Sequence, residues 1–320
     1  MIPPHEAFVI TVRSPPAVIS IDVDSLWVLA ENMGCTAELD ETAIYTQAVP
    51  EFLRLLDLFS IKATFFCVGK DLTVECNRAI VAEIVRRGHE IGNHTMTHPK
   101  NWAELGSNDI IDEIAGCHEV MGKAGGKDVV GFRASGYYLD SRMVSVLREM
   151  GYVYDTSVLP SYYMSLLMPL GRMLMARSTK VNWPCGQFAY GTAPRSPYIL
   201  NERDIFHPAV EGDILELPIA SSSFLRLPFH STIVFATGFW FFNWALHTFR
   251  QTGLPLVYVF HAVDLLDNDK KDFLKKYVTT RVLYSRRLEI VESILARIVK
   301  EYRVITGCQL AYETKGALCQ

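Results

Sequence analysis

The stretch "AVISIDVDS", residues 17–25, decides how the chain is interpreted. Residues 17–23 are mostly small or β-branched, which is typical of a strand buried in a parallel sheet. Two carboxylates, Asp22 and Asp24, stand at the end of this segment. Alternate side chains of an extended strand point to the same side, so the two carboxylates share a face. A solvated strand end or a helix N-cap would also explain them, so the rest of the chain has to decide what they do.

The composition narrows the classes of protein. A chain of 320 residues with 49% hydrophobic residues can form one large domain or two ordinary ones. The net charge of −4 argues against a nucleic-acid partner. The seven cysteines include no C-x-x-C pair, which argues against a disulfide framework or a thiolate zinc site. Because the N-terminal segment also lacks the pattern of a signal peptide, we expect a cytoplasmic location.

Strand-like and helix-like segments alternate along the chain, which predicts an α/β fold with a parallel sheet. About seven such units indicate a barrel rather than an open sheet. The rhythm breaks at 157–213, which is rich in Pro, Tyr, Met and Ser. We interpret this segment as an apolar insertion near the barrel mouth, within a single domain spanning 1–320. The predicted strands are 17–23, 62–68, 89–94, 128–134, 214–220 and 254–260, and the predicted helices are 48–60, 78–88, 109–126, 141–151 and 288–298.

Chemically capable side chains stand where these strands end. In parallel α/β folds, functional residues collect at the carboxyl ends of the strands. Core packing alone does not produce this coincidence, so we predict a site at that end of the barrel. The residues concerned are Asp22, Asp24, His94, His98, Arg133, Asp155 and His261.

The segment "HTMTH" places His94 and His98 four residues apart. On one helical turn or in a tight loop, this spacing brings both imidazoles to one metal ion. Either Asp22 or Asp24 can complete a His-His-Asp set with open positions for water and substrate. The other carboxylate can then take a proton from the water. Two surface histidines in a polar loop are the structural alternative, which the nearby aspartates disfavour.

With these residues in place, the chain resembles the polysaccharide deacetylases of the NodB-homology family, which are similar to carbohydrate esterase family 4. The resemblance covers residues 17–306. It is strongest to members with a D-x-D first motif, such as the undecaprenyl-phosphate formamido-arabinose deformylase type. The motifs that carry it, in chain order, are "SIDVDS", "HTMTH", "FRASGY", "YDTS" and "VFH".

The resemblance implies a distorted (β/α)7 barrel and a metal-dependent N-deacetylase or deformylase. By position in the motifs, Asp24, His94 and His98 correspond to the metal ligands. The implied cofactor is one divalent metal ion, with Zn²⁺ expected. Val23 separates the two aspartates, whereas many members have adjacent ones, so the division of labour between Asp22 and Asp24 needs its own test.

The same resemblance implies roles for four further residues. Asp22 corresponds to the general base, Arg133 to the cation that holds it, and Asp155 to the residue that steadies Arg133. His261 corresponds to the general acid. We also expect a backbone N–H near Arg133 or Ala134 to stabilise the oxyanion of the tetrahedral intermediate.

The third motif departs from the family pattern, since Ser135 stands where proline is usual. The loop after Arg133 is therefore expected to differ from that of other members.

A charge-free run of 23 residues lies between Arg226 and Arg250. It is long enough to cross a bilayer, but its polar residues and the need to return His261 to the site argue against spanning. A barrel segment with its packed helix explains it, as does a surface that faces lipid. Residues 161–177 raise the same question, as an internal lid or an interfacial stretch. We predict peripheral membrane contact through 161–177 and 227–246.

Three functions follow from this reading. The favoured one is removal of an acetyl or formyl group from an amino sugar that is lipid-linked or membrane-proximal, at the inner face of the membrane. The alternative substrates are chitin-like oligomers, peptidoglycan or a small cyclic amide. A catalytically idle barrel that binds sugar or lipid is the third. Metal content and amine release separate the idle barrel from the enzymes.

Overall fold

A curled sheet organises the fold in the computed structural model, which describes residues 14–32, 34–35, 39–125, 129–163, 188–267 and 274–318. Its central strand, β1 (Pro16–Val23), pairs in parallel with β8 (Leu256–His261) along one edge. It also pairs in parallel with β2 (Thr64–Cys67) and, at its beginning, with β9 (Arg303–Ile305). Its side chains are buried on both faces, as the sequence predicts.

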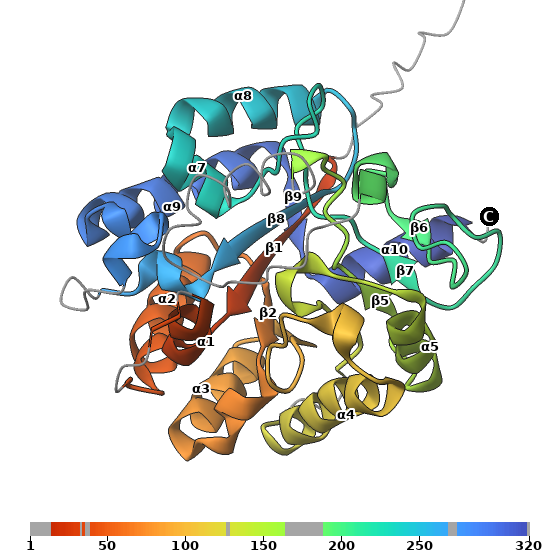
Figure 1. The fold of residues 1–320 in the computed structure, drawn as a ribbon. Helices are drawn as coiled ribbons and strands as arrows, with labels where there is room; N and C mark the ends of the chain where they lie inside the picture. The colour runs from red at the N-terminus through yellow and green to blue at the C-terminus, as the bar shows by residue number, and fades with distance from the viewer. Residues whose placement is uncertain are drawn as a thin grey trace, which may run out of the picture.

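The sheet continues from β2 in the order β3, β4, β5, β7, β6 (Figure 1). Every described pairing is parallel except that of β6 with β7. The parallel strands therefore deliver their carboxyl ends to one edge of the sheet. The bounds are β3 (Glu90–Asn93), β4 (Gly131–Phe132), β5 (Tyr154–Asp155), β6 (Tyr198–Ile199) and β7 (Leu215–Glu216).

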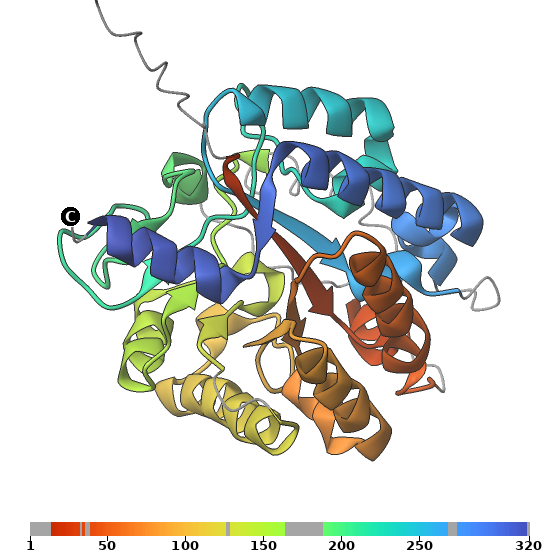
Figure 2. The same ribbon diagram turned by 180° about the vertical axis from the view of Figure 1, so that it is seen from behind.

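Helices surround the sheet, and Figure 2 shows α9, β9 and α10 following one another across the back. Helix α4 illustrates why they pack, because its buried residues recur at helical spacing: Ile110, Ile114, Cys117 and Met121. The α-helices are α1 (Leu26–Asn32), α2 (Val49–Leu58), α3 (Glu75–Arg86), α4 (Ser107–Lys123), α5 (Ser141–Glu149), α7 (Ser231–Thr237), α8 (Phe239–Arg250), α9 (Tyr284–Glu301) and α10 (Gly307–Leu318). Shorter helical turns are η1 (Ile44–Ala48), η2 (Gly69–Thr73), η3 (Trp102–Glu104), η4 (Ser135–Tyr137), η5 (Phe188–Thr192), η6 (Ala262–Leu265), η7 (Leu274–Lys276) and η8 (Thr279–Arg281).

The predicted distorted α/β barrel is confirmed, as a curled mixed sheet surrounded by helices. The described part of the predicted insertion, at 188–213, contributes β6 to the same sheet, and residues 164–187 lie outside the described residues. The single domain over 1–320 stays a prediction.

The charge-free segment 227–246 forms α7 and the first part of α8, and most of its apolar side chains are buried. The large apolar side chain of this segment that is exposed is Trp240, with 67% of its surface accessible. The described residues thus favour a barrel segment with its packed helices. None of the helices in the described part of the chain combines the length and hydrophobicity that a membrane span requires. Of the stretch 161–177, residues 164–177 lie outside the described residues.

Candidate active site

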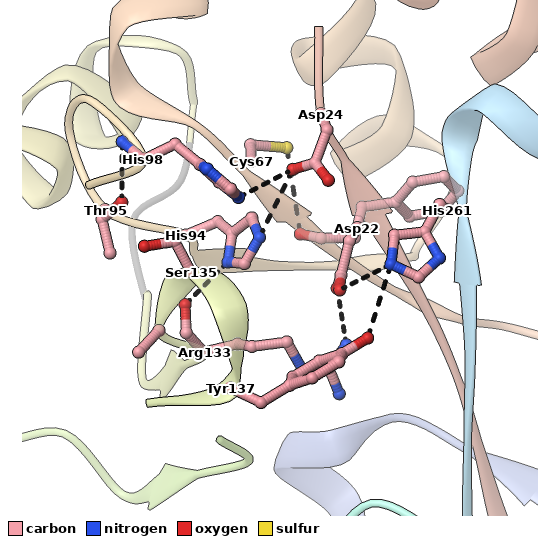
Figure 3. A network of polar contacts seen from close by, with 12 residues as sticks. Asp22, Asp24, Cys67, His94, Thr95, His98, Arg133, Ser135, Tyr137 and His261 are labelled. Carbon is pink, nitrogen blue, oxygen red and sulfur yellow. Dashed lines mark hydrogen bonds and ion pairs between the residues drawn. The ribbon is translucent and has the colours of Figure 1, made fainter. Parts of the chain in front are cut away.

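Three of the predicted residues meet beyond the carboxyl ends of β1 and β3 (Figure 3). The Oδ1 atom of Asp24 lies 3.4 Å from Nε2 of His94 and 3.4 Å from Nε2 of His98. Their ligand atoms all lie within 4.8 Å of one another. Burial alone would raise the pKa of Asp24, but the facing imidazoles of His98 and His94 outweigh it and hold that pKa below its usual range. The aspartate is therefore ionised and can act as a ligand.

The two histidines share a tight loop rather than a helix. Thr95 and His98 have positive φ angles of 69° and 54°. The left-handed conformation costs a non-glycine residue about 1–2 kcal/mol, so neighbouring contacts have to impose it. The Thr95 hydroxyl accepts the His98 N–H at 3.1 Å, and Glu113 on α4 accepts the N–H of Thr97 at 2.8 Å. These contacts fix the loop that presents both imidazoles to Asp24.

The hydrogen bonding of the histidines suits a metal ligand. Nδ1 of His94 lies 2.7 Å from the carbonyl oxygen of Arg133, so Nδ1 carries a hydrogen and Nε2 is the nitrogen that faces Asp24. Burial lowers the pKa of His98 to about 4, which keeps this ring neutral. The buried Asp24 Oδ1 accepts no hydrogen bond from any described residue. One carboxylate and two imidazoles that converge in this way fit a divalent ion such as Zn²⁺.

Asp22 lies beside this cluster and is held by Arg133. Nη1 of Arg133 donates to Oδ1 of Asp22 at 2.6 Å, and both side chains are buried. The Nε and Nη2 atoms of Arg133 donate to the carbonyl and hydroxyl oxygens of Thr156, respectively. The guanidinium group lies over the ring of Phe66. This arrangement fixes one carboxylate oxygen of Asp22 and leaves Oδ2 directed toward His261.

His261 reaches the site because β8 pairs with β1 so that His261 is opposite Asp22. Its Nε2 lies 4.0 Å from Oδ2 of Asp22, and its Nδ1 lies 3.4 Å from Oγ1 of Thr232. Its backbone N–H donates to Asp264 at 3.0 Å. The base and acid candidates are thus neighbours on adjacent strands.

Asp155 lies behind Arg133 but bonds elsewhere. Its carboxylate accepts the N–H and the hydroxyl of Ser157, and it contacts Glu216, its partner across β5 and β7. Burial raises the pKa of Asp155 and of Glu216, so the two carboxyls hold a proton between them. The steadying of Arg133 by Asp155 stays a prediction. Sequence reasoning missed Glu216, because it lies in the middle of the predicted strand 214–220, whereas the observed strand β7 ends at this residue.

A backbone N–H near Arg133 or Ala134 as oxyanion donor stays a prediction, and the N–H groups of these two residues are already engaged. The Arg133 N–H donates to the carbonyl of Asn93 at 2.9 Å, and the Ala134 N–H donates to the Ser157 hydroxyl at 2.8 Å. The expected difference between the following turn and that of other members stays a prediction. The Ser135 hydroxyl, where proline is usual in the resembled family, bonds the Pro99 carbonyl at 2.5 Å.

Two further side chains near His261 were missed in the sequence. Tyr137 places its hydroxyl oxygen 3.4 Å from Nε2 of His261. The buried ring of His230 lies 6.1 Å from the His261 ring, centroid to centroid. Neither residue stands at the end of a predicted strand. A search for polar residues at strand ends, which identified the other site residues, therefore does not find them.

Comparison with known proteins agrees with the geometry. Residues 38–154 match the polysaccharide deacetylase family. That range includes His94, His98 and Arg133 but not Asp22, Asp24 or His261.

Two curated relatives match shorter parts of the chain. A peptidoglycan-N-acetylglucosamine deacetylase of Bacillus cereus is 33% identical over 106 residues, which are 32% of this chain and 46% of the relative. A chitooligosaccharide deacetylase of Sinorhizobium fredii is 34% identical over 65 residues, which are 20% of this chain and 29% of the relative. The matched region thus spans less than half the length of either relative.

The similarity in fold covers more of the chain than the similarity in sequence. A crystal structure from Mycobacterium smegmatis, assigned to the polysaccharide deacetylases, aligns with a TM-score of 0.62 at 18% identity and covers 95% of this chain and 91% of that one. At this identity the likeness concerns the fold. The chain is therefore similar to the polysaccharide deacetylases over residues 38–154, and its fold is similar to that of the Mycobacterium smegmatis structure.

Proposed function

We propose that this protein is a metal-dependent hydrolase that removes an N-acyl group from an amino sugar. The observation that carries the proposal is the convergence of Asp24, His94 and His98 beside a buried carboxylate, Asp22, and a second candidate proton carrier, His261. Metal ligands, a base and an acid within one small space are what amide hydrolysis requires.

The proposed chemistry assigns one task to each group. A divalent ion held by Asp24, His94 and His98 would polarise the amide carbonyl and lower the pKa of a water molecule. Asp22, kept in place by Arg133, takes the proton from the attacking water through Oδ2. His261 donates a proton to the amine as the C–N bond breaks. The products are a carboxylic acid and a free amino sugar.

The acyl group and the carrier of the sugar are finer parts of the proposal. We propose acetyl or formyl as the acyl group, on a sugar linked to a polyprenyl phosphate at the inner face of the membrane. The charge-free run 227–246 motivates the lipid, and the exposed Trp240 is the part of that run that can contact it. Residues 164–177, the second motive, lie outside the described residues.

A second substrate class has its own support. The packing of most of 227–246 into the core reduces the apolar surface that a lipid-linked substrate would use. The curated relatives are deacetylases of peptidoglycan N-acetylglucosamine and of chitooligosaccharides. An N-acetylglucosamine oligomer without a lipid is therefore the second candidate substrate.

The test is a panel of amino sugars, acetylated and formylated, free, oligomeric and polyprenyl-linked. Amine release and metal content are measured together for each preparation. We expect release that depends on the metal, with kcat/KM highest for the lipid-linked form because a remote tail can help to position the amide. Equal kcat/KM with and without the tail would remove the lipid from the proposal. A metal-loaded protein that releases no amine from any member would leave the idle sugar-binding barrel as the better account.

A further inference from the structure

The turn after β4 brings an additional polar group to the reacting centre. Tyr137, in η4, directs its side chain toward Asp22 and His261, as Figure 3 shows. Its hydroxyl oxygen lies 3.4 Å from Nε2 of His261. The ring also faces the buried His230, with 6.3 Å between the ring centroids. The hydroxyl thus lies next to the acid candidate His261, beside the pair that His261 forms with Asp22.

The backbone takes an unfavourable conformation at this point. Tyr137 has a φ of 57°, directly after Gly136 at 67°, so two successive residues are left-handed. Glycine tolerates this conformation, but tyrosine does not adopt it without support. Strain of this kind at a non-glycine residue is concentrated at functional sites, where the surroundings impose it.

Neighbouring segments supply that support. The Ser135 hydroxyl bonds the Pro99 carbonyl, and Trp102 donates its indole N–H to the Ser135 hydroxyl at 2.9 Å. On the other side of the turn, the Ala134 N–H donates to Ser157. The loop of the histidines and the strand end at β5 therefore both hold the turn that aims Tyr137.

The hydroxyl can only act as a neutral donor or acceptor. Burial raises the pKa of Tyr137 well above its usual value, and the negative charges of Asp22 and Asp24 act in the same direction. The phenol therefore stays protonated. The N–H groups of Arg133 and Ala134 are already engaged, so the neutral phenol beside His261 offers a hydrogen bond that these two amides do not.

We propose that Tyr137 is a catalytic residue whose hydroxyl donates a hydrogen bond to the oxygen of the reacting amide. This inference rests on the proposed amide hydrolysis. A planar amide accepts hydrogen bonds at its oxygen, so a donor beside the base and the acid meets that atom. As negative charge develops on the oxygen, the hydrogen bond strengthens, which lowers the barrier more than it strengthens substrate binding. No proton leaves Tyr137 in this step.

The test compares Tyr137→Phe with Tyr138→Phe in the metal-loaded protein. The first change keeps the ring and removes the hydroxyl. The second removes the hydroxyl of the next residue, which contacts Asp140 instead of the site. We expect Tyr137→Phe to lower kcat by about 10²–10³-fold, with KM changed less than about threefold. The pH values of half-maximal activity should stay unchanged, and Tyr138→Phe should behave as wild type.

Acetate binding, measured by calorimetry, supplies a readout that needs no turnover. The loss of one hydrogen bond to a carboxylate oxygen should weaken acetate about 3–10-fold in Tyr137→Phe and leave Tyr138→Phe unaffected. An active Tyr137→Phe with wild-type kcat and acetate affinity would overturn the inference and leave the hydrolase proposal standing. A shift of the alkaline limb of the pH–activity profile in Tyr137→Phe would instead make Tyr137 a positioning residue for His261. Wild-type protein that neither releases amine nor binds acetate would overturn both proposals.

Discussion

The loop at 94–98 and the segment at 227–246 both suggested a function in the sequence, but they differ in backbone conformation and in the polarity of what they bury. The loop is short and polar, and two of its residues adopt left-handed backbone conformations. The segment is long and apolar, forms ordinary helices and buries most of its side chains. A site is indicated where polar groups converge at strand ends although the backbone conformation that brings them together is unfavourable. Hydrophobicity alone does not distinguish core from lipid-facing surface, because both need the same side chains.

The two regions also differ in what they contribute to stability. The loop buries two imidazoles against the carboxylate of Asp24, and their mutual contacts only partly replace the hydration of these groups. Each fully buried aromatic or aliphatic side chain of 227–246 stabilises the fold by about 1.5–3 kcal/mol. Changes in the loop should therefore affect metal and activity, whereas changes in the segment should affect stability.

The largest effect is expected in the loop. His98→Ala removes one of three ligands, so we expect metal occupancy and amine release to fall to background while the fold is kept. His207→Ala is the matched control. His207 is an exposed histidine that pairs with Asp204, and it is far from His98 in the sequence. Elemental analysis and circular dichroism provide the measurements. Full metal retention in His98→Ala would refute the ligand assignment.

The next effect separates the two aspartates. Asp22→Asn should keep the metal and lower kcat by about 10²–10⁴-fold, because it removes a proton acceptor held against Arg133. Asp24→Asn should lose the metal. The opposite pattern, with metal lost at Asp22 and kept at Asp24, would exchange the two roles.

The sequence predicted most of the fold and the composition of this site. The burial of residues 17–23 and the helical spacing in 109–126 are local signals, and both elements form where expected. His94 and His98 could be found because a spacing of four residues can bring two imidazoles together, and both do lie beside Asp24. Asp22 and His261 are far apart in the chain, but the strand-end rule placed both at one edge.

What the sequence could not supply depends on contacts between distant segments. Tyr137 enters the site through a backbone conformation that no propensity favours for tyrosine. The amides of Arg133 and Ala134 are engaged by Asn93 and Ser157, which only the packed strands reveal. The exposure of 227–246 likewise depends on which neighbours cover it. These features follow from tertiary structure, so local pattern gave no signal for them.

A smaller effect tests the other side of the comparison. Phe242→Ala in α8 should lower the free energy of unfolding by about 3–5 kcal/mol, because a fully buried aromatic side chain leaves a cavity. Trp240→Ala, two residues earlier and exposed, should change it by less than about 0.5 kcal/mol. Chemical denaturation measures both. Equal destabilisation at the two positions would mean that Trp240 is covered in solution.

The smallest effect concerns pH and lies away from the site. His89 is buried, its Nδ1 accepts the Ala63 N–H at 3.1 Å, and burial lowers its pKa to about 4. Because the unfolded chain then binds more protons between pH 6.5 and 4, stability is present above this window and is lost as pH falls through it. The expected loss is about 1–3 kcal/mol.

His89→Asn keeps an acceptor near the same position without a titrating group. It should flatten the pH dependence of the melting temperature in this window, while amine release per folded molecule stays unchanged. An unchanged slope in His89→Asn would show that other groups, such as the buried His230 with its pKa of about 3, carry the effect.

The most direct test of the central claim is metal-dependent amine release by the wild-type protein. Chelator-treated protein is titrated with Zn²⁺ while amine release from an N-acetyl amino sugar is followed. We expect no release without metal and a linear rise to a plateau at one ion per chain, and we expect this rise to be absent in His98→Ala. Full activity in protein shown by elemental analysis to contain no metal would contradict it.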